Sequence, residues 1–326
     1  MAAAELSIVI INWNGGDLLT RCIQSIINSN IEVEFELIVV DNASSDDSMS
    51  RLEADPIGSV LISTGQLRTI RNSENIGFGR ANNQAFEATS SPFVFLLNTD
   101  AELKPGTANT LLKTIKSHDR IGACGPKILN PDGSTQTSVY FNPPRFWHTF
   151  LWQLKLHRLL PSSIRGTFLL GPHWKHDTRR DVPMLTGAAL LVRREVIETV
   201  GGFNEIFHMY SEDNEWCWRI TNEGWRLVFE PEAIVLHQGG ASALRRWTLE
   251  EKIEVQLDSE FQFTSLALSK FDLIANQLAN NVVVNAQIGA RKIRGMDVAE
   301  LWVIRKAHKR NLKRCFVNKD RAEPKQ

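Results

Sequence analysis

The sequence lacks an excess of charge of either sign, since 37 Lys and Arg residues balance 37 Asp and Glu residues. Overall charge therefore gives no reason to expect a nucleic-acid partner. The balance fails near the C-terminus, where residues 291–326 contain twelve Lys or Arg and four Asp or Glu. The basic tail is thus a local feature, and the rest of the chain is mildly acidic.

Closely spaced cysteines and long hydrophobic runs are also lacking. The four cysteines lie far apart without a CxxC pair, which predicts reduced, buried thiols and neither a zinc site nor a disulfide framework. The first residues lack the basic segment and apolar core of a signal peptide. No apolar run approaches the roughly 20 residues that cross a bilayer. We expect the protein to fold in the cytoplasm.

Apolar runs alternate with helical patterns in the first 120 residues. Near-continuous apolar runs at residues 7–13, 35–40 and 92–98 predict strands buried on both faces, and helical spacing follows each of them. Residues 59–63 and 67–71 are two further expected strands, and 225–229 and 233–236 are two more. This order predicts an α/β sandwich with a mostly parallel sheet. Residues 146–160 predict a Trp-rich helix, and the chain beyond 249 is expected to be helical.

Polar residues stand where three of these apolar runs end. Asp41, Asp100 and His237 each follow an expected strand, and ligands of open α/β sheets bind beyond the carboxyl ends of strands. Asp41 can accept hydrogen bonds from a base or a ribose. Asp100 suits a hard divalent cation that bridges phosphates, and His237 would suit Mn²⁺ or Mg²⁺ beside it. The alternatives are two turn aspartates and a structural histidine.

Two adjacent carboxylates, Glu212 and Asp213, begin an expected helix after Ser211, a favourable N-cap residue. Acidic residues in a first turn are stabilised by the helix dipole, which is the structural interpretation. The functional interpretation is that one of them removes a proton from an acceptor hydroxyl, with a pKa raised by burial and by its neighbour.

Residues 75–83 form a glycine-containing loop that opens a helix, where bare backbone can approach a nucleotide. The third glycine of a dinucleotide fingerprint is absent, because Asn82 stands there. The alternative is a plain helix-entry loop. This pattern argues against a Rossmann-type dehydrogenase.

The tail at residues 301–316 has helical spacing of apolar residues, with Lys or Arg at 305, 306, 309, 310, 313 and 314. Such a helix can lie on an anionic bilayer, or it can pack on the domain with a solvated basic face. Trp147, Trp152 and Trp174 are candidates for sugar stacking or a membrane interface, with core packing as the alternative.

Taken together, eight motifs in order resemble family 2 glycosyltransferases with a GT-A fold, and most of all their bacterial rhamnosyltransferase-like branch. They are SIVIINWNG, VVDNASSD, NIGFGRANN, LLNTD, LTGAALLVRRE, GGFNEIF, YSEDNEWCWR and HQGGAS. The resemblance implies a GT-A domain at 1–248, with a nucleotide-sugar half at 1–120 and an acceptor half at 121–248, and a helical extension at 249–326. It places these residues around the nucleotide sugar: Asn12, Asp41, Asn75, Gly77, Asn82, Asn83, Asn98 and Asp100.

The resemblance also implies a mechanism. Asp213 would be the catalytic base, with Glu212 as the second candidate, and Asp100 and His237 would hold Mn²⁺ or Mg²⁺. An inverting enzyme would move one sugar, rhamnose from dTDP-rhamnose, to a lipid-linked or surface-glycan acceptor in cell-envelope polysaccharide synthesis. Contact with the inner face of the membrane would come through the basic helix.

Two positions depart from the family pattern. Asn98 replaces the first acidic residue of the metal-binding motif, which removes one charge from the site. No QxxRW motif is present, so we expect one sugar per acceptor. A catalytically degenerate nucleotide-sugar or glycan-binding relative is the alternative, and a nucleotidyltransferase is disfavoured because a basic glycine-rich N-terminal loop is absent.

Overall fold

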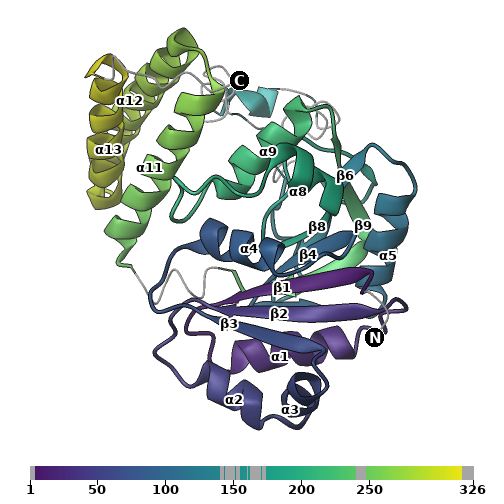
Figure 1. The fold of residues 1–326 in the computed structure, drawn as a ribbon. Coiled ribbons are helices and arrows are strands. Elements are labelled where there is room, and N and C mark those ends of the chain that lie inside the picture. The colour runs from purple at the N-terminus through teal and green to yellow at the C-terminus, as the bar shows by residue number, and fades with distance from the viewer. Residues whose placement is uncertain are drawn as a thin grey trace. The chain divides into compact units, whose positions relative to one another are not determined.

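The computed structural model describes residues 4–139, 143, 151, 155–159, 161, 170, 174–239 and 247–317 (Figure 1). The chain forms two compact units. The first comprises Met1–Asn142 and Gly166–Arg245, and the second comprises Pro143–Arg165 and Arg246–Gln326. The predicted boundary at residue 248 lies three residues beyond the end of the first unit.

The first unit is built on a sheet whose N-terminal part is parallel. Its strands are β1 (Leu6–Asn12), β2 (Phe35–Asp41), β3 (Leu67–Arg71) and β4 (Phe93–Asn98), in the order β3-β2-β1-β4. Because these strands run in one direction, their carboxyl ends meet at one edge of the sheet. The strands expected from the apolar runs at residues 7–13, 35–40 and 92–98 are confirmed.

Beyond β4 the sheet becomes mixed. β8 (Ala189–Arg193) is antiparallel to β4 and to β6 (Ile121–Leu129), which runs parallel to β9 (Arg226–His237). β5 (Ala101–Leu103) and β7 (Arg180–Asp181) pair antiparallel with β9. The α/β fold is confirmed, but the mostly parallel sheet holds only for its first half. Strand–helix alternation, which enforces parallel pairing, stops after β4.

Two expected elements differ in the structure. The strand expected at residues 59–63 is wrong, because Pro56–Ser63 forms helix α3. The Asp55 side chain accepts hydrogen bonds from the N–H groups of Ile57 and Gly58, and Pro56 occupies the first turn, which together start a helix. The two strands expected between 225 and 236 are one strand, β9, because a register irregularity against β6 absorbs Pro231.

Helices cover both faces of the sheet (Figure 1). α1 (Asp17–Ile27) and α5 (Thr107–Lys116) share one hydrophobic cluster with Ile8 and Ile10, whereas α4 (Phe78–Glu87) and α9 (Glu212–Asn222) share another with Val9. Adjacent β1 side chains thus face opposite layers, as the pleat requires. α2 (Ser48–Ala54) and α8 (Arg194–Val200) complete the described helices of this unit. All four cysteines are free and buried, as expected.

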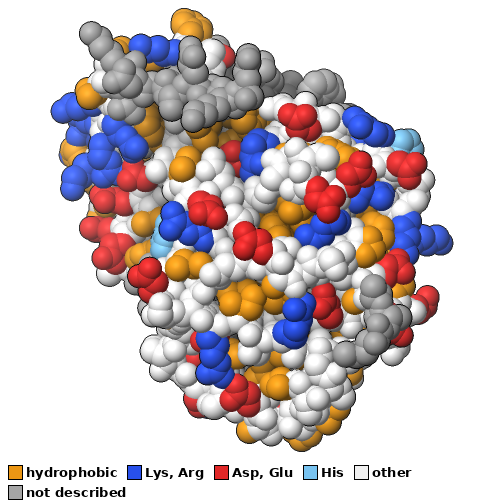
Figure 2. Space-filling view, viewed as in Figure 1, with side chains coloured by type: hydrophobic (Ala, Val, Ile, Leu, Met, Phe, Trp, Pro, Cys, Tyr) orange, Lys and Arg blue, Asp and Glu red, His pale blue; other side chains and the backbone are white. Residues whose placement is uncertain are grey.

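The second unit contains α11 (Leu249–Ala267), α12 (Lys270–Ile293) and α13 (Ala299–Val317), which confirms the helical C-terminal extension. Thr248 and Glu251 form a capping box at the start of α11. Lys and Arg side chains gather over α13 (Figure 2). None of the helices within the described ranges is both long and apolar enough to cross a membrane.

Several expectations fall largely outside the described residues. Of the helix expected at residues 146–160, the structure describes a short 3-10 helix, η1 (Leu156–Leu159). Trp147 and Trp152 lie outside the described residues. Trp174 is buried and its ring centroid lies 4.7 Å from that of Phe229, which favours the core interpretation for this residue.

Candidate active site

The ends of β1 and β2 hold a buried polar pair. Asn12 and Asp41 are register partners in the two strands, and Asn12 Nδ2 donates to Asp41 Oδ1 over 2.9 Å. The same amide donates to Ser48 Oγ at the start of α2. Both side chains are buried. The amide therefore fixes the Asp41 carboxylate at the strand edge where ligands of α/β sheets bind.

The glycine-containing loop is tied to this edge by a residue that the sequence did not single out. Asn42 Nδ2 donates to Asn75 Oδ1 at 3.1 Å and to the Gly77 carbonyl at 3.3 Å, and its Oδ1 accepts from Ile76 N. Gly77 has φ +92°, and a Cβ there would meet the His208 carbonyl at 2.7 Å. Only glycine fits this close approach. The sequence signal that could have identified Asn42 is its position directly after Asp41, at the end of the strand.

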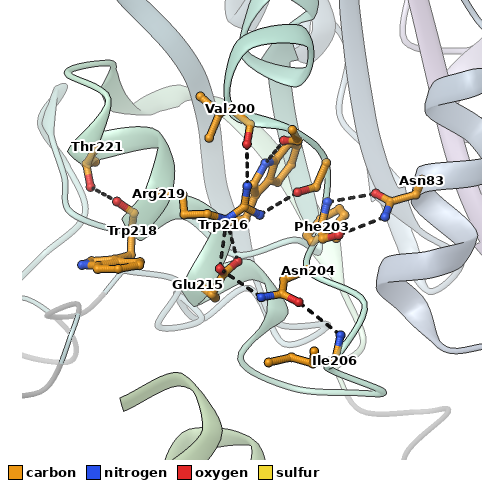
Figure 3. Close-up of polar contacts among 12 residues, drawn as sticks. Asn83, Val200, Phe203, Asn204, Ile206, Glu215, Trp216, Trp218, Arg219 and Thr221 are labelled. Carbon is orange, nitrogen blue, oxygen red and sulfur yellow. Dashed lines mark hydrogen bonds and ion pairs between the residues drawn. The ribbon is translucent and has the colours of Figure 1, made fainter. Parts of the chain in front are cut away.

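Asn82 and Asn83 make hydrogen bonds within the protein. Asn82 Nδ2 donates to the Phe78 carbonyl of its own helix. Asn83 Nδ2 donates to the Phe203 carbonyl and Asn83 Oδ1 accepts from Phe203 N, each over 2.9 Å (Figure 3). The Asn83 amide thus holds the segment that precedes α9. These contacts do not support the predicted place of either residue in a nucleotide pocket.

The same segment is anchored to α9 from the other side (Figure 3). Trp216 Nε1 donates to the Gly201 carbonyl at 2.8 Å, and Arg219 donates to the carbonyls of Val200 and Gly202. Arg219 Nε also donates to Glu215 over 2.9 Å. The GGFN segment therefore couples α4 to α9, the helix that begins with Glu212.

Asp100 and His237 meet, as the sequence predicted. His237 Nε2 lies 3.1 Å from Asp100 Oδ1 and 3.3 Å from Asn98 Nδ2. The contact arises because β5 folds back on β9 and pairs Ala101 with His237. Both side chains are only 10 % exposed. No cluster of three or more His, Cys, Asp or Glu side chains suited to a metal occurs within the described ranges.

Gln136, which the sequence did not predict, orients the histidine. Gln136 Nε2 donates to Asn130 Oδ1 at 3.0 Å, so its Oε1 faces His237 Nδ1 at 2.8 Å. In the neutral ring Nδ1 must then carry the proton, and Nε2 presents its lone pair beside the Asp100 carboxylate. Two acceptors that face each other across 3.1 Å fit a divalent cation, which takes nitrogen and oxygen ligands of this kind.

The two carboxylates at the start of α9, Glu212 and Asp213, differ in their hydrogen bonds and in their pKa shifts. Asp213 Oδ2 accepts from Gly187 N at 3.0 Å and Oδ1 accepts from Asn214 N at 2.9 Å. Glu212 is buried, and its Oε2 has no hydrogen-bond partner among the described residues. Burial, with Asp213 as the second cause, raises the pKa of Glu212 to about 8. Burial also raises the pKa of Asp213, but the two backbone N–H groups oppose that rise. Glu212 therefore holds the proton of the pair and Asp213 the charge.

The expected N-cap of this helix is only partly confirmed. Ser211 occupies the N-cap position, but its side chain makes no capping hydrogen bond and its φ is +64°. The preceding Tyr210 has φ +68°. Two successive left-handed residues turn the chain sharply into α9 and leave the side chain of Ser211 unsuited to the usual cap.

A series of hydrogen bonds connects the carboxylate pair at the start of α9 to Asp100 and His237. Asp213 is bonded to Gly187, and the next residue, Ala188, accepts from Asn98 N at 2.9 Å. Asn98 in turn contacts His237. The carboxylate of Asp213 and the pair Asp100 and His237 thus lie on either side of the junction of β4 and β8. This arrangement is suited to removing a proton from a nucleophile beside an anionic leaving group.

Comparison with known proteins identifies matching families. The family model described as Glycosyl transferase family 2 matches residues 7–201, which is more than half of the chain. The model described as Glycosyl transferase family 21 matches residues 179–248. The two matches together span the strand-end residues and α9.

Two curated relatives each match about three quarters of this chain. An N-acetylglucosaminyl-diphospho-decaprenol L-rhamnosyltransferase of Mycobacterium tuberculosis is 29% identical, over 74% of this chain and 78% of the relative. The O-antigen biosynthesis protein RfbC of Myxococcus xanthus is 26% identical over 73% of this chain, and the match spans 18% of that protein.

Two solved structures share the fold at 15% identity. GalNAc-T7 with UDP, GalNAc and Mn²⁺ has a TM-score of 0.58, and the match covers 94% of this chain and 55% of that one. The mannosyltransferase PcManGT from Pyrobaculum calidifontis, in complex with GDP-Man and Mn²⁺, has a TM-score of 0.55, with 98% and 89% covered.

Proposed function

The chain belongs to glycosyl transferase family 2, and from this premise we propose that it transfers a single sugar with inversion from a nucleotide diphosphate sugar to an acceptor hydroxyl. The observation that carries the proposal is the hydrogen-bonded path from Asp213 through Gly187, Ala188 and Asn98 to His237. It connects Asp213, the proposed base at the start of α9, through the β4–β8 junction to the proposed metal-binding pair, in which Asp100 follows β4 and His237 ends β9.

Asp213 is the base of the proposed reaction. An acceptor hydroxyl is too weakly acidic to attack unaided, and a positioned carboxylate that takes its proton accelerates such steps roughly 10²- to 10⁴-fold. The two N–H groups that Asp213 accepts from favour its charged form. Glu212 keeps its proton at neutral pH and so avoids a second charge beside the base.

Asp100 and His237 would hold Mn²⁺ or Mg²⁺ together with diphosphate oxygens of the donor. When bound, the cation offsets the negative charge that develops on the leaving nucleoside diphosphate. Asn98 supplies an uncharged amide where a carboxylate would add a further ligand charge, so we expect modest metal affinity without the donor. Gln136 keeps the His237 lone pair aimed at the site.

The donor pocket of the proposal lies at the ends of β1 and β2. Asp41, held by Asn12, would accept hydrogen bonds from the base or the ribose, and the loop with Asn75 and Gly77 would lie beside it. We propose rhamnose from dTDP-rhamnose as the donor, because the mycobacterial relative is named as an L-rhamnosyltransferase. That name also supports a lipid-linked acceptor. The site of action would be the cytoplasmic face of the membrane, with peripheral contact through the basic C-terminal helix.

A thermal-shift screen tests the donor. Samples receive dTDP-rhamnose, UDP-glucose, UDP-galactose or GDP-mannose, with and without Mn²⁺ or Mg²⁺. A ligand at 100 times its dissociation constant adds roughly 2.7 kcal/mol of stability, so a shift with one donor and metal identifies the sugar. Absence of any shift would contradict the donor assignment.

A transfer assay tests the base. Asp213→Asn should lose transfer by at least about 10²-fold while it keeps the thermal shift with the donor, because only the proton acceptor is removed. Equal activity in the variant would refute the role of Asp213. No transfer by the unaltered protein, despite a donor-induced shift, would instead favour a degenerate nucleotide-sugar-binding relative, an alternative suggested by Asn98.

A further inference from the structure

One face of α13 is turned away from the other helices of its unit. Leu301, Ala307, His308, Asn311 and Cys315 are the buried residues of the helix. Five of the exposed residues recur at intervals of three or four, so they share the opposite face. They are Trp302, Lys306, Lys309, Lys313 and Phe316, and we call this set the lysine stripe.

The lysines of this stripe differ from the arginines beside them. Arg310 and Arg314 both contact Asp258 of α11, at 2.8 and 3.3 Å. Arg305 stacks over the Trp302 ring, with its guanidinium carbon 4.5 Å from the centroid. In contrast, Lys306, Lys309 and Lys313 form no ion pair with any residue that the structure describes. Arg310 and Arg314 thus hold α13 against α11, whereas the lysine charges face outward.

Trp302 and the three lysines of the stripe line a groove of about 1130 Å³. Six of the lining residues are Lys or Arg, and the single carboxylate among the lining residues is Glu250. Figure 2 shows Lys and Arg side chains gathered over α13. Large apolar side chains stand at both ends of the stripe, since Trp302 is 41% exposed and Phe316 is 62% exposed. The surface therefore combines concentrated positive charge with aromatic ends.

We propose that the lysine stripe of α13 docks on the phosphate headgroups of an anionic lipid bilayer, with Trp302 and Phe316 at the level of the interface. Lysines with long apolar stems reach phosphates while their stems follow the surface, and aromatic rings favour the boundary between headgroups and chains. A nucleic-acid backbone would satisfy the lysines but would leave both aromatic ends in water. The charges and the apolar ends together fit a bilayer.

The proposal extends the proposed function, because a lipid-linked acceptor would be met at such a surface. The proposal concerns binding to a lipid surface, however, and this binding can be measured without a donor or an acceptor. Vesicles free of any glycan acceptor are therefore the probe, and loss of vesicle binding would say nothing against sugar transfer. Asp213→Asn should bind these vesicles as the unaltered protein does.

The test is flotation of the full chain with vesicles of phosphatidylcholine alone or with 30% phosphatidylglycerol. The triple variant Lys306→Gln, Lys309→Gln, Lys313→Gln should bind anionic vesicles about 100-fold more weakly, since each lysine near an anionic surface contributes about 1 kcal/mol. The matched control Lys104→Gln, Lys113→Gln, Lys175→Gln removes the same charge from exposed positions elsewhere and should bind unchanged.

Fluorescence adds a readout at the aromatic end. Lipids brominated near the headgroup should quench Trp302, and the quenching should disappear in Trp302→Phe. Equal binding by the lysine triple variant, or equal affinity for neutral vesicles, would overturn the proposal. So would loss of binding in 10 mM inorganic phosphate at constant ionic strength, which indicates a site for free phosphate, or tighter binding to a DNA duplex than to anionic vesicles.

Discussion

At the residue scale, the site depends on side chains whose partners fix their chemical state. Gln136 is the clearest case, because its orientation by Asn130 determines which nitrogen of His237 bears the proton. A second residue of this kind is Asn12, whose amide holds Asp41 in place. Neither is expected to touch the reacting atoms. Both act through a neighbour, and their loss should alter binding before it alters chemistry.

We expect Gln136→Leu to weaken Mn²⁺ binding roughly 10- to 100-fold, because residues that orient a metal-binding histidine contribute this much to affinity. Loss of the free Mn²⁺ signal in electron paramagnetic resonance, recorded in the presence of the nucleoside diphosphate, measures the affinity. Gln136→Glu keeps an oxygen acceptor for Nδ1–H and is the control, with affinity near that of the unaltered protein. Unchanged affinity in the leucine variant would show that Gln136 does not orient His237.

Glu212 makes a second residue-scale prediction, on stability. The pKa of its carboxyl rises from 4.5 in the unfolded chain to about 8 in the folded protein, because the group is buried beside Asp213. Its stabilising effect is fully present below pH 4.5 and is lost as the pH rises through about 8. Glu212→Gln should therefore raise the melting temperature at pH 8.5 and change it little at pH 5.

Calorimetry of Glu212→Gln at the two pH values gives the comparison, with Glu205→Gln as a control on an exposed carboxyl of the same unit. The amide has the same shape and cannot ionise, so any pH-dependent difference reports the proton of Glu212. A variant that is equally destabilised at both pH values would mean that the carboxyl makes a contact that the amide cannot replace.

The sequence predicted that Asp41, Asp100 and His237 lie at strand ends, because each follows an apolar run. The contact between Asp100 and His237 also requires the pairing of β5 with β9. Gln136 carries no such pattern, because its position depends on how a turn returns to the sheet. Asn42 directly follows Asp41, but this spacing does not show that its side chain bonds to Asn75. Asn82 and Asn83 were placed beside the nucleotide from their motif, but spacing cannot show which way an amide points.

At the element scale, α9 is held by the segment that precedes it (Figure 3). Asn83 makes two hydrogen bonds to Phe203 and a third to Glu205 over 3.2 Å. A Cβ on Gly202 would lie 2.3 Å from Asn83 Oδ1, so the segment fits tightly against the amide. The entry of α9, and with it Asp213, therefore depends on α4.

We expect Asn83→Ala to destabilise the protein by about 1–3 kcal/mol, because it leaves the N–H and carbonyl of Phe203 without partners. Urea unfolding measures the change, and Gln84→Ala in the same helix serves as a comparison that removes two hydrogen bonds to Asn72. The donor-induced thermal shift should persist. A variant of normal stability whose donor affinity falls would restore the predicted place of Asn83 in the nucleotide pocket.

Helices and strands could be predicted where the period of the apolar residues agrees with the burial of their side chains. Strands buried on both faces appear in the sequence as apolar runs, and each of the three expected at residues 7–13, 35–40 and 92–98 is present. Residues 59–63 are also rich in β-branched side chains, but they follow Asp55 and Pro56. The capping hydrogen bonds of Asp55 stabilise a helix here instead of a strand. The mixed second half of the sheet was not predictable, since strand direction there depends on long connections that carry no periodic signal.

At the scale of the whole molecule, the two units differ in the kind of core that they build. The first buries apolar side chains on both sides of a sheet. The helical unit buries a series of amides as well, at Asn276, Gln277, Asn280 and Asn281 of α12 and Asn311 of α13. Amides in a helical core give less burial energy than apolar side chains and depend on satisfied hydrogen bonds. These amides do not ionise, so the sensitivity of the helical unit to pH comes from a buried group that does titrate.

His308 provides that sensitivity. Burial lowers its pKa from 6.5 to about 4, so the folded unit holds the ring neutral while the unfolded chain protonates it. Stability is then unaffected above pH 6.5 and falls as the pH drops towards 4, by about 2 kcal/mol at pH 4.5. This slope is opposite in sign to that of Glu212, which stabilises the first unit as the pH falls from 8 to 4.5.

His308→Leu separates this contribution from all other titrations. The variant should lose less stability than the unaltered protein between pH 7 and pH 4.5, because leucine takes up no proton in either state. Scanning calorimetry at both pH values gives the difference between the two proteins, and His118→Leu, at an exposed position in the first unit, should leave the pH dependence unchanged. An identical loss in His308→Leu and the unaltered protein would mean that another group carries the acid sensitivity, and that the buried ring of His308 is as easily protonated in the folded unit as in water.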